Sequence, residues 1–345
     1  MPAPAPPSVT TRNAVVFLAV IAGAATLKWM QDILTPLALA LFLAVMIDSF
    51  ARVLTDRTPR FPRRLALPTA VVLSLLLFGV SIWIVVDNGK EFFDHSTQYI
   101  DSLNAIIAKF TPTVARLAPG LELSVAPTIG DLVKQWNPQR YFGDVAQSFN
   151  SFATSAVLVL IYLGFILASR RGFARKIVAL FPNHAERDTN MKMFERIRDG
   201  VEQYLWIQTV TGLMIAAAAF VVMMLVGLDN ALFWAFLIFL AAYIPILGGA
   251  IGCFLPPIFA LIQIPDSLWP AIILFAALQG IFFVVGNVVL PRMQGDSLNM
   301  DPTVVLLSLA VWGALWGVPG MFLSTPLTVA AMVILAQFEG SRWIA

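Results

Sequence analysis

The sequence contains few of the residues with which proteins build metal centres, disulfides and charged binding surfaces. Its 345 residues include one cysteine and two histidines, and only 12% of them are charged. The lone Cys253 excludes an intramolecular disulfide framework, and so few thiol and imidazole groups argue against a metal site. The formal net charge is +2, and the basic residues form no stripe of the kind that binds a phosphate backbone. Nucleic acid is therefore not an expected partner.

Motifs of intramembrane and hydrolytic enzymes are missing as well. The sequence has no His-Glu-x-x-His zinc motif, no Gly-x-Ser-x-Gly elbow for a nucleophilic serine and no paired intramembrane aspartates. Such motifs supply the metal, the nucleophile or the acid–base pair that these reactions need. We therefore predict that the protein is not an enzyme and that it uses no cofactor.

Apolar residues dominate the chain. They make up 59% of the sequence, and the mean hydropathy is +0.82, which is typical of an all-α polytopic membrane protein whose partner is the lipid bilayer. The first apolar run, residues 14–27, is interpreted as an uncleaved span rather than a signal peptide. We expect a disordered cytoplasmic N-terminus at residues 1–13, three transmembrane helices within residues 14–86 and a fourth transmembrane helix at residues 151–169.

Two groups of basic residues predict the orientation. Five arginines follow the second span within thirteen residues, and eight basic residues follow the fourth span. The positive-inside rule places both groups, and both chain termini, in the cytoplasm. Residues 87–150 then form an extracytoplasmic helical insert, and residues 170–205 form amphipathic cytoplasmic helices against the lipid headgroups. The basic residues are Arg52, Arg57, Arg60, Arg63 and Arg64, then Arg170, Arg171, Arg175, Lys176, Arg187, Lys192, Arg196 and Arg198.

The C-terminal region, residues 206–338, contains two apolar tracts that are poorly suited to span a membrane. Each opens with an aspartate and is interrupted near its middle by proline and glycine, at residues 229–265 and 301–338. The arms of the first tract are about 16 residues long, below the roughly 20 that a spanning helix needs. We interpret both tracts as helical hairpins that form an inverted repeat, because the span before each hairpin reverses its orientation.

The breaks in these hairpins are the strongest candidates for a transport site. Interrupting a membrane helix frees backbone N–H and C=O groups, which must be satisfied by protein, water or ligand. We expect both tips to take part in solute binding. The proline and glycine residues responsible are Pro245, Gly248 and Gly249 in the first hairpin, and Gly317, Pro319 and Gly320 in the second.

Polar side chains near the breaks are few. Gln208 and Asn287 lie in otherwise apolar runs, and each can either bind a small polyol-like solute or bridge two helices. Asp229 and Asp301 open the two hairpins, where capping of the helix N-terminus is the favoured role and ion binding the alternative. Glu202 can serve as a proton or cation site or as a solvated interfacial carboxylate. No carboxylate lies mid-span in the C-terminal half, which argues against obligatory ion coupling.

Three stretches of the sequence carry a family resemblance: the entry to the fifth span, the first hairpin tip and the long tract that contains the second tip. Their residues include Gly200, Gln208, Tyr243, Pro245, Asn287, Pro291, Pro302, Trp316, Gly317, Pro319, Gly320 and Pro326. With these stretches the sequence resembles the AI-2E family of autoinducer-2 exporters and PerM-type permeases from about residue 14 to residue 338, and the final tract is the most specific part.

The resemblance implies about eight hydrophobic segments, a homo-oligomer for which a pentamer is one candidate, and export of small molecules across the bacterial inner membrane. It adds Tyr243, Pro291, Asp301 and Pro302 to the candidate binding residues. The chain departs from the family pattern in two places: Ala242 replaces a usual asparagine, and Asp301 a frequent histidine. Both changes alter groups that can contact a ligand. The resemblance therefore predicts the fold but does not predict the substrate.

Three functions are compatible with these features. The favoured one is a carrier that exports a small polar organic solute such as autoinducer-2 by alternating access. A Na⁺(Li⁺)/H⁺ antiporter, which some relatives resemble, is the alternative within transport. A membrane scaffold organised around residues 87–150 is the alternative outside it, and deleting that insert separates a scaffold, which loses its role, from a carrier, which keeps some flux.

Overall fold

The computed structural model describes residues 9–57, 62–94, 101–102, 155–169, 184–294 and 301–336. Within these ranges nearly every residue is helical and no strand occurs. The predicted all-α fold is therefore confirmed. Most of the predicted extracytoplasmic insert and the first part of the predicted amphipathic segment, residues 170–183, lie outside the described residues.

Several described helices are suited to a membrane. Four are long and apolar enough to cross it, and five more are apolar but shorter. This confirms a polytopic membrane protein, while the number of spans stays a prediction. The four long segments are Gln31–Thr55, Met191–Val226, Trp269–Gln294 and Thr303–Leu335, and the shorter ones are Ala14–Trp29, Leu65–Leu77, Ser155–Ser169, Ala231–Ala242 and Leu247–Gln263.

The helices fall into two compact units. The first unit contains α1 (Val9–Trp29), the helix Ser155–Ser169 and α12 (Pro302–Leu335). The second contains α3 (Arg63–Asp94) and the helices between Ala231 and Gln294. Two helices contribute to both units, because the division falls after Ala44 in α2 (Gln31–Arg57) and after Ile197 in α7 (His184–Val226).

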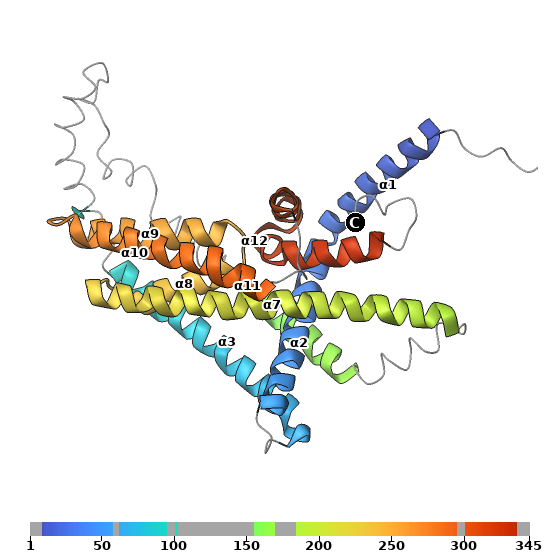
Figure 1. Cartoon of the computed structure of the whole chain (residues 1–345), viewed down its shortest axis with the longest axis horizontal. Helices are drawn as coiled ribbons and strands as arrows, with labels where there is room; N and C mark the ends of the chain where they lie inside the picture. The colour runs from blue at the N-terminus through green and yellow to red at the C-terminus, as the bar shows by residue number, and fades with distance from the viewer. Residues whose placement is uncertain are drawn as a thin grey trace, which may run out of the picture. The chain divides into compact units, whose positions relative to one another are not determined.

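The second unit is built around the first hairpin. Helix α8 (Ala231–Ala242) turns back into α9 (Leu247–Gln263), α9 packs on α10 (Trp269–Val284), and these three helices run beside the C-terminal part of α7 (Figure 1). Their common core is rich in small residues, which let helices approach closely where lipid supplies no hydrophobic driving force. Its fully buried members include Ala219, Met223, Ile238, Ala260, Leu274 and Leu278.

Helix α10 continues through an irregular turn. Residues Val285–Val289 form one turn of π-helix, in which the Leu290 N–H bonds to the Val285 carbonyl, and α11 (Leu290–Gln294) follows. Pro291 explains the irregularity, because it has no N–H to donate and its ring clashes with the carbonyl four residues earlier, that of Asn287.

Three helices extend past the segment bounds predicted from the sequence. Helix α1 already begins at Val9, so residues 9–13 are helical rather than disordered. Helix α3 continues to Asp94, past the expected end of the third span at residue 86. Helix α7 is one helix of 43 residues without a break at 205, because no proline interrupts residues 184–226. At 1.5 Å per residue it is about 65 Å long, so only part of it fits a hydrocarbon core of about 30 Å.

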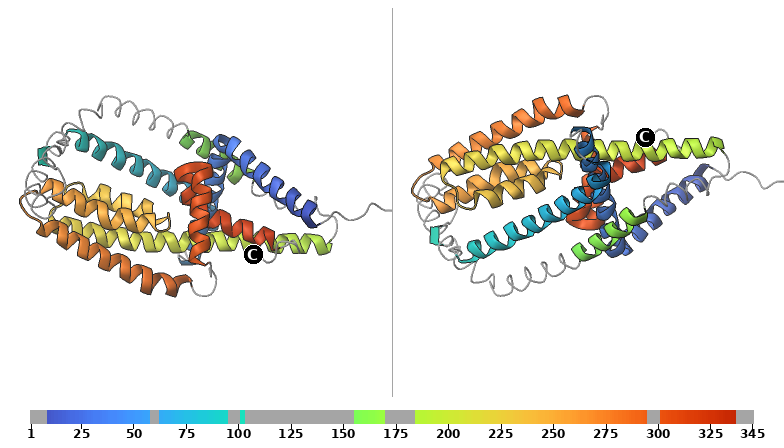
Figure 2. Two further views of the ribbon diagram at one scale, coloured as in Figure 1. Left: turned by 90° about the horizontal axis from the view of Figure 1, so that it is seen from above. Right: turned by 90° about the horizontal axis from the view of Figure 1, so that it is seen from below.

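The second hairpin is sharply bent rather than continuous. Helix α12 has helical geometry on both sides of Gly317, whose backbone angles are φ 65° and ψ −144°. Figure 2 shows α12 (red) as two helical arms that run in different directions. The predicted break is thus at the predicted glycine. The inverted relation between the two hairpins stays a prediction.

Candidate functional sites at two broken helices

The first break lies between α8 and α9. Pro245 has no N–H, and Ile246 has φ 67° and ψ −48°, a conformation that residues with a side chain rarely adopt. The Leu247 N–H donates to the Pro245 carbonyl at 2.7 Å, which closes a γ-turn of the strained, positive-φ form. The carbonyls of Ala242 and Tyr243 consequently lack the i+4 partners that a continuous helix would give them.

Side chains of α7 satisfy these two carbonyls. The Gln208 amide donates from Nε2 to the Ala242 oxygen, and the Tyr204 hydroxyl donates to the Tyr243 oxygen at 3.3 Å. Because residues four apart lie on one face of a helix, both donors point at the same tip. The Tyr243 hydroxyl in turn lies 2.7 Å from Thr209 Oγ1. Gln208 therefore bridges two helices, and its binding to a solute stays a prediction.

The two glycines of this tip have different surroundings. A Cβ on Gly248 would lie 2.6 Å from the Ala241 oxygen and 2.8 Å from the Ala242 Cα, so the arms approach each other too closely for a side chain. A Cβ on Gly249 would have nothing within 4 Å. Gly248 thus makes the tight reversal possible, whereas Gly249 contributes no close approach.

The second break is centred on Gly317. Its φ and ψ fall in a region open almost only to glycine. Pro319 follows, and it removes the N–H that would bond to the Leu315 carbonyl. Gly320 lets the second arm touch the first, because a Cβ there would overlap the Trp312 carbonyl oxygen and lie 2.9 Å from the Trp316 Cβ.

Helix α1 supplies the partners for this second break. The Lys28 ammonium donates to the carbonyl oxygens of Ala314 at 3.2 Å and Leu315 at 3.0 Å. The Trp316 indole N–H donates to the Leu27 carbonyl at 3.1 Å, and Trp316 is itself buried. The end of α1 and the end of the first arm of α12 are thereby held together.

Other candidate residues lie away from the tips. Asn287 belongs to the π-helical turn, and its amide donates to the Phe283 carbonyl of its own helix at 2.9 Å. Asp301 caps α12 by accepting the Thr303 N–H at 2.7 Å, and Pro302 takes the first helical position, as expected. Hydrogen bonds from the Thr303 side chain and backbone lower the pKa of the Asp301 carboxyl.

Asp229 does not cap α8. Asn230 occupies the N-cap position with φ 54°, and no side chain caps the helix. Instead, the Asp229 backbone N–H donates to Gln263 Oε1 at 2.9 Å, and Gln263 Nε2 donates to the Gly227 carbonyl at 3.0 Å. One amide side chain at the end of α9 thus fixes the turn between α7 and α8.

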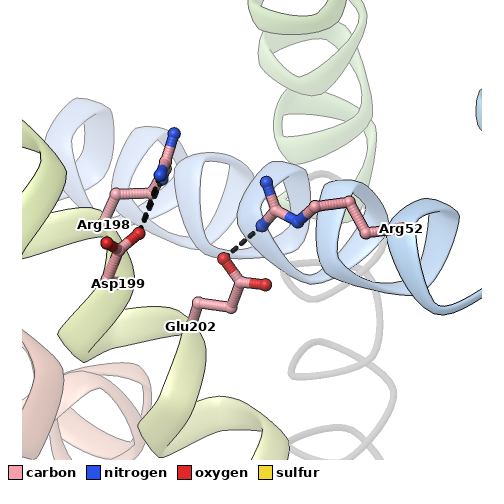
Figure 3. A network of polar contacts seen from close by, with 4 residues as sticks. All are labelled: Arg52, Arg198, Asp199 and Glu202. Atoms are coloured by element: carbon pink, nitrogen blue, oxygen red, sulfur yellow. Dashed lines mark hydrogen bonds and ion pairs between the residues drawn. The ribbon is translucent and has the colours of Figure 1, made fainter. Parts of the chain in front are cut away.

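Glu202 lines a shallow, open cavity of about 560 Å³ and forms an ion pair with Arg52 of α2. A second ion pair, Arg198 with Asp199 at 2.8 Å, lies beside it (Figure 3). Arg52 neutralises the carboxylate that a transported cation would need. The residues lining the cavity are Ser49, Arg52, Val53, Arg198, Asp199, Glu202, Gln203 and Trp206.

Among the residues that sequence analysis missed are three that bond to the breaks or to Glu202, namely Tyr204, Lys28 and Arg52. Tyr204 precedes Gln208 by four residues, and this helical spacing was the available signal. Lys28 lies between two apolar runs, where a basic residue is ordinarily found at the membrane interface, so no signal in the sequence singled it out. Arg52 was recognised only as one of several arginines that set the orientation.

Comparisons with known proteins agree with the architecture. A family described as AI-2E family transporter matches residues 16–340. A Haemophilus influenzae protein named "Putative transport protein" is 28% identical over 320 residues, which are 92% of this chain and 90% of the relative. The AI-2 transport protein TqsA of Escherichia coli K12 is 26% identical over 320 residues, with the same two shares. A third relative, from the same strain and named "Putative transport protein YhhT", is 27% identical over 317 residues, which are 91% of this chain and 87% of the relative.

Proposed function

Because the chain belongs to the AI-2E family of transporters, we propose that it is a carrier that exports a small polar organic solute across the bacterial inner membrane by alternating access. Both termini lie in the cytoplasm, and the active form is a homo-oligomer. Autoinducer-2 is the first solute to test, because a relative that aligns over 90% of its length is named as an AI-2 transport protein.

The breaks in two membrane helices support this proposal best. Helix α8 has 12 residues and α9 has 17, so they are about 18 Å and 26 Å long, shorter than a hydrocarbon core of about 30 Å. Their tip carbonyls are satisfied by side chains of another helix rather than by their own backbone. Such bonds can be exchanged for bonds to solute hydroxyls without unwinding a helix, which a site with alternating access requires.

A Na⁺/H⁺ antiporter has weaker support. The Glu202 carboxylate is paired with Arg52, and the part of the chain that the structure describes contains no group of three or more metal-ligating acidic, His or Cys side chains. A hydroxylated solute recognised through carbonyl and amide groups fits the tips better than a bare cation held by carboxylates.

Flux in proteoliposomes tests the proposal. We expect labelled autoinducer-2, or another small polyol-like solute from a panel, to cross vesicles that contain the purified protein. Gly248→Leu and Gly317→Leu should each abolish this flux, whereas Gly164→Leu should not, because a Cβ at Gly164 has nothing within 4 Å. Monodisperse behaviour in detergent must be shown for all three variants. Undiminished flux in both tip variants would refute a role for the tips, and proton movement driven by Na⁺ without solute would favour the antiporter.

A further inference from the structure

The second break pairs a helix end with a charged side chain from another helix. The first arm of α12 ends at Gly317, and the carbonyls of its last turn include those of Ala314 and Leu315. The Lys28 ammonium lies 3.2 Å and 3.0 Å from these two oxygens. The bond between the Trp316 indole and the Leu27 carbonyl fixes the backbone beside Lys28, so that the ammonium is aimed at the helix end.

This helix end attracts a cation for two reasons. The partial charge at the C-terminus of a helix is roughly −0.5 of an elementary charge, and it acts mainly within the last turn. Pro319 also leaves the Leu315 carbonyl without its usual N–H donor, so an oxygen lone pair is available there. In membrane transporters, the C-terminal ends of broken helices are places where coupling cations bind.

The neutral donors at the first tip make the charge at the second tip informative. Hydrogen bonding alone requires only an amide or a hydroxyl, and Gln208 and Tyr204 fill that role for Ala242 and Tyr243. Lysine is long, flexible and strongly hydrated, so it is a poor choice for a purely structural hydrogen bond. Its distinctive contribution at Ala314 and Leu315 is the positive charge.

We propose that the carbonyl oxygens of Ala314 and Leu315 form a binding site for a monovalent cation or a primary ammonium group, and that Lys28 occupies this site as a tethered cation. While Lys28 is in place, a free cation has no access to the two oxygens. Solute transport by the native chain therefore does not depend on Na⁺ at this position. Removing the side chain opens the site, and the protein then responds to small cations in solution.

Thermal unfolding of Lys28→Ala tests this directly. The background is Cys253→Ala with Ser324→Cys, which places the only thiol at a fully buried position of α12, so that a thiol-reactive dye reports unfolding of the first unit. Ethylammonium, Na⁺ and K⁺ chlorides are compared with choline chloride at equal ionic strength, since choline carries the charge but no N–H donor and is larger. The parent protein with Lys28 is the matched control.

We expect Lys28→Ala to unfold at a lower temperature than its parent in choline chloride. Saturating ethylammonium should raise its Tm by about 2–4 °C, and should leave the Tm of the parent unchanged. Equal Tm values of the variant in all four salts would overturn the proposal. If Lys28→Ala does not fold, Lys28→Gln replaces it: a neutral amide can be displaced by a cation, so a Tm no higher in ethylammonium than in choline would again be the overturning result.

The inference rests on the proposed function and deepens it by assigning the group that occupies one tip, but its test is independent of transport. The unfolding measurement contains no transported solute. A negative result would remove the cation site and leave the carrier proposal standing, whereas absence of solute flux would remove the carrier and leave the cation site.

Discussion

The two broken helices meet the same requirement with different chemistry. In the first, the freed carbonyls of Ala242 and Tyr243 accept hydrogen bonds from a neutral amide and a neutral phenol on α7. In the second, the carbonyls of Ala314 and Leu315 accept hydrogen bonds from the Lys28 ammonium on α1. The Tyr204 and Tyr243 side chains of the first break are buried, whereas Lys28 is exposed.

This difference separates a break served by neutral donors from a break served by a cation. Hydrogen bonds from neutral donors can be exchanged for bonds to solute hydroxyls, but they respond little to salt. A charged donor on an exposed chain can be replaced by another cation, and its interaction depends on which ions are present. The backbone differs too, because the first break places Ile246 at positive φ and the second places Gly317 there. The first break is therefore the more strained of the two.

The largest expected effect is at the contact between the arms of the second break. Gly320→Ala would put a Cβ onto the Trp312 carbonyl oxygen, and backbone atoms cannot move aside as a flexible side chain can. We expect a loss of more than about 3 kcal/mol of unfolding free energy, so that little folded protein is recovered. The Ser324→Cys thiol should react with dye even at low temperature in this variant.

The control for that substitution is Gly23→Ala in α1 of the same unit. A Cβ there would have nothing within 4 Å, and alanine favours a helix over glycine by about 1 kcal/mol. An unchanged or slightly raised Tm is expected. Equal Tm values for Gly320→Ala and Gly23→Ala would show that the arms of α12 do not touch as described.

The next largest effect separates two adjacent glycines of the first tip. Gly248→Ala would bring a Cβ to 2.6 Å from the Ala241 oxygen, whereas Gly249→Ala meets nothing within 4 Å. We expect Gly248→Ala to lower the unfolding free energy by about 2–3 kcal/mol. Gly249→Ala should leave it unchanged or higher. Dye reaction of the buried Cys253 thiol on α9 measures both variants next to the tip. Similar losses in the two would contradict the close approach at Gly248.

The positions of the breaks could be predicted from sequence because their causes are local. Proline lacks an N–H wherever it stands, and glycine alone tolerates φ 65° with ψ −144°, so Pro245, Gly317 and Pro319 are candidate breaks from sequence alone. Proline is not sufficient, however, because Pro256 and Pro257 lie inside α9 without ending it. The same reasoning found the Asp301 cap. It failed for Ile246, because an isoleucine at positive φ is imposed by the surrounding turn and has no signature in the sequence.

The partners of the freed carbonyls could be predicted only in part. Gln208 was found because an amide is conspicuous in an apolar run. Lys28 was not, because a lysine that ends a span is ordinarily an interfacial residue, and its partners lie 286 and 287 residues away along the chain. The unbroken course of α7 was missed for a related reason: a change from polar to apolar residues alters the environment of a helix without ending it.

Two substitutions with opposite expected effects test the difference in backbone strain between the two breaks. Gly317→Ala imposes a side chain on a glycine conformation and should cost about 1–3 kcal/mol, whereas Ile246→Gly relieves the strained γ-turn and should stabilise the protein by about 1 kcal/mol. Unfolding of Gly317→Ala is measured by dye reaction of the Ser324→Cys thiol, and unfolding of Ile246→Gly by dye reaction of the Cys253 thiol. A destabilised Ile246→Gly would mean that contacts of the isoleucine outweigh its backbone strain.

The smallest effects are expected from the neutral donors of the first break. Gln208→Leu removes the amide that bonds to the Ala242 oxygen and leaves a buried carbonyl without it, for which we expect a loss of about 1–1.5 kcal/mol. Tyr204→Phe removes a longer bond of 3.3 Å and keeps the ring, so about 0.5 kcal/mol is expected. The stability of both variants is measured by dye reaction of the Cys253 thiol in the four salts used for Lys28→Ala. Because neither donor is charged, the deficit of each variant should be the same in ethylammonium and in choline. A Gln208→Leu deficit that ethylammonium reversed would show that the first break also accepts a cation, and the contrast between a neutral break and a cation-binding break would then be wrong.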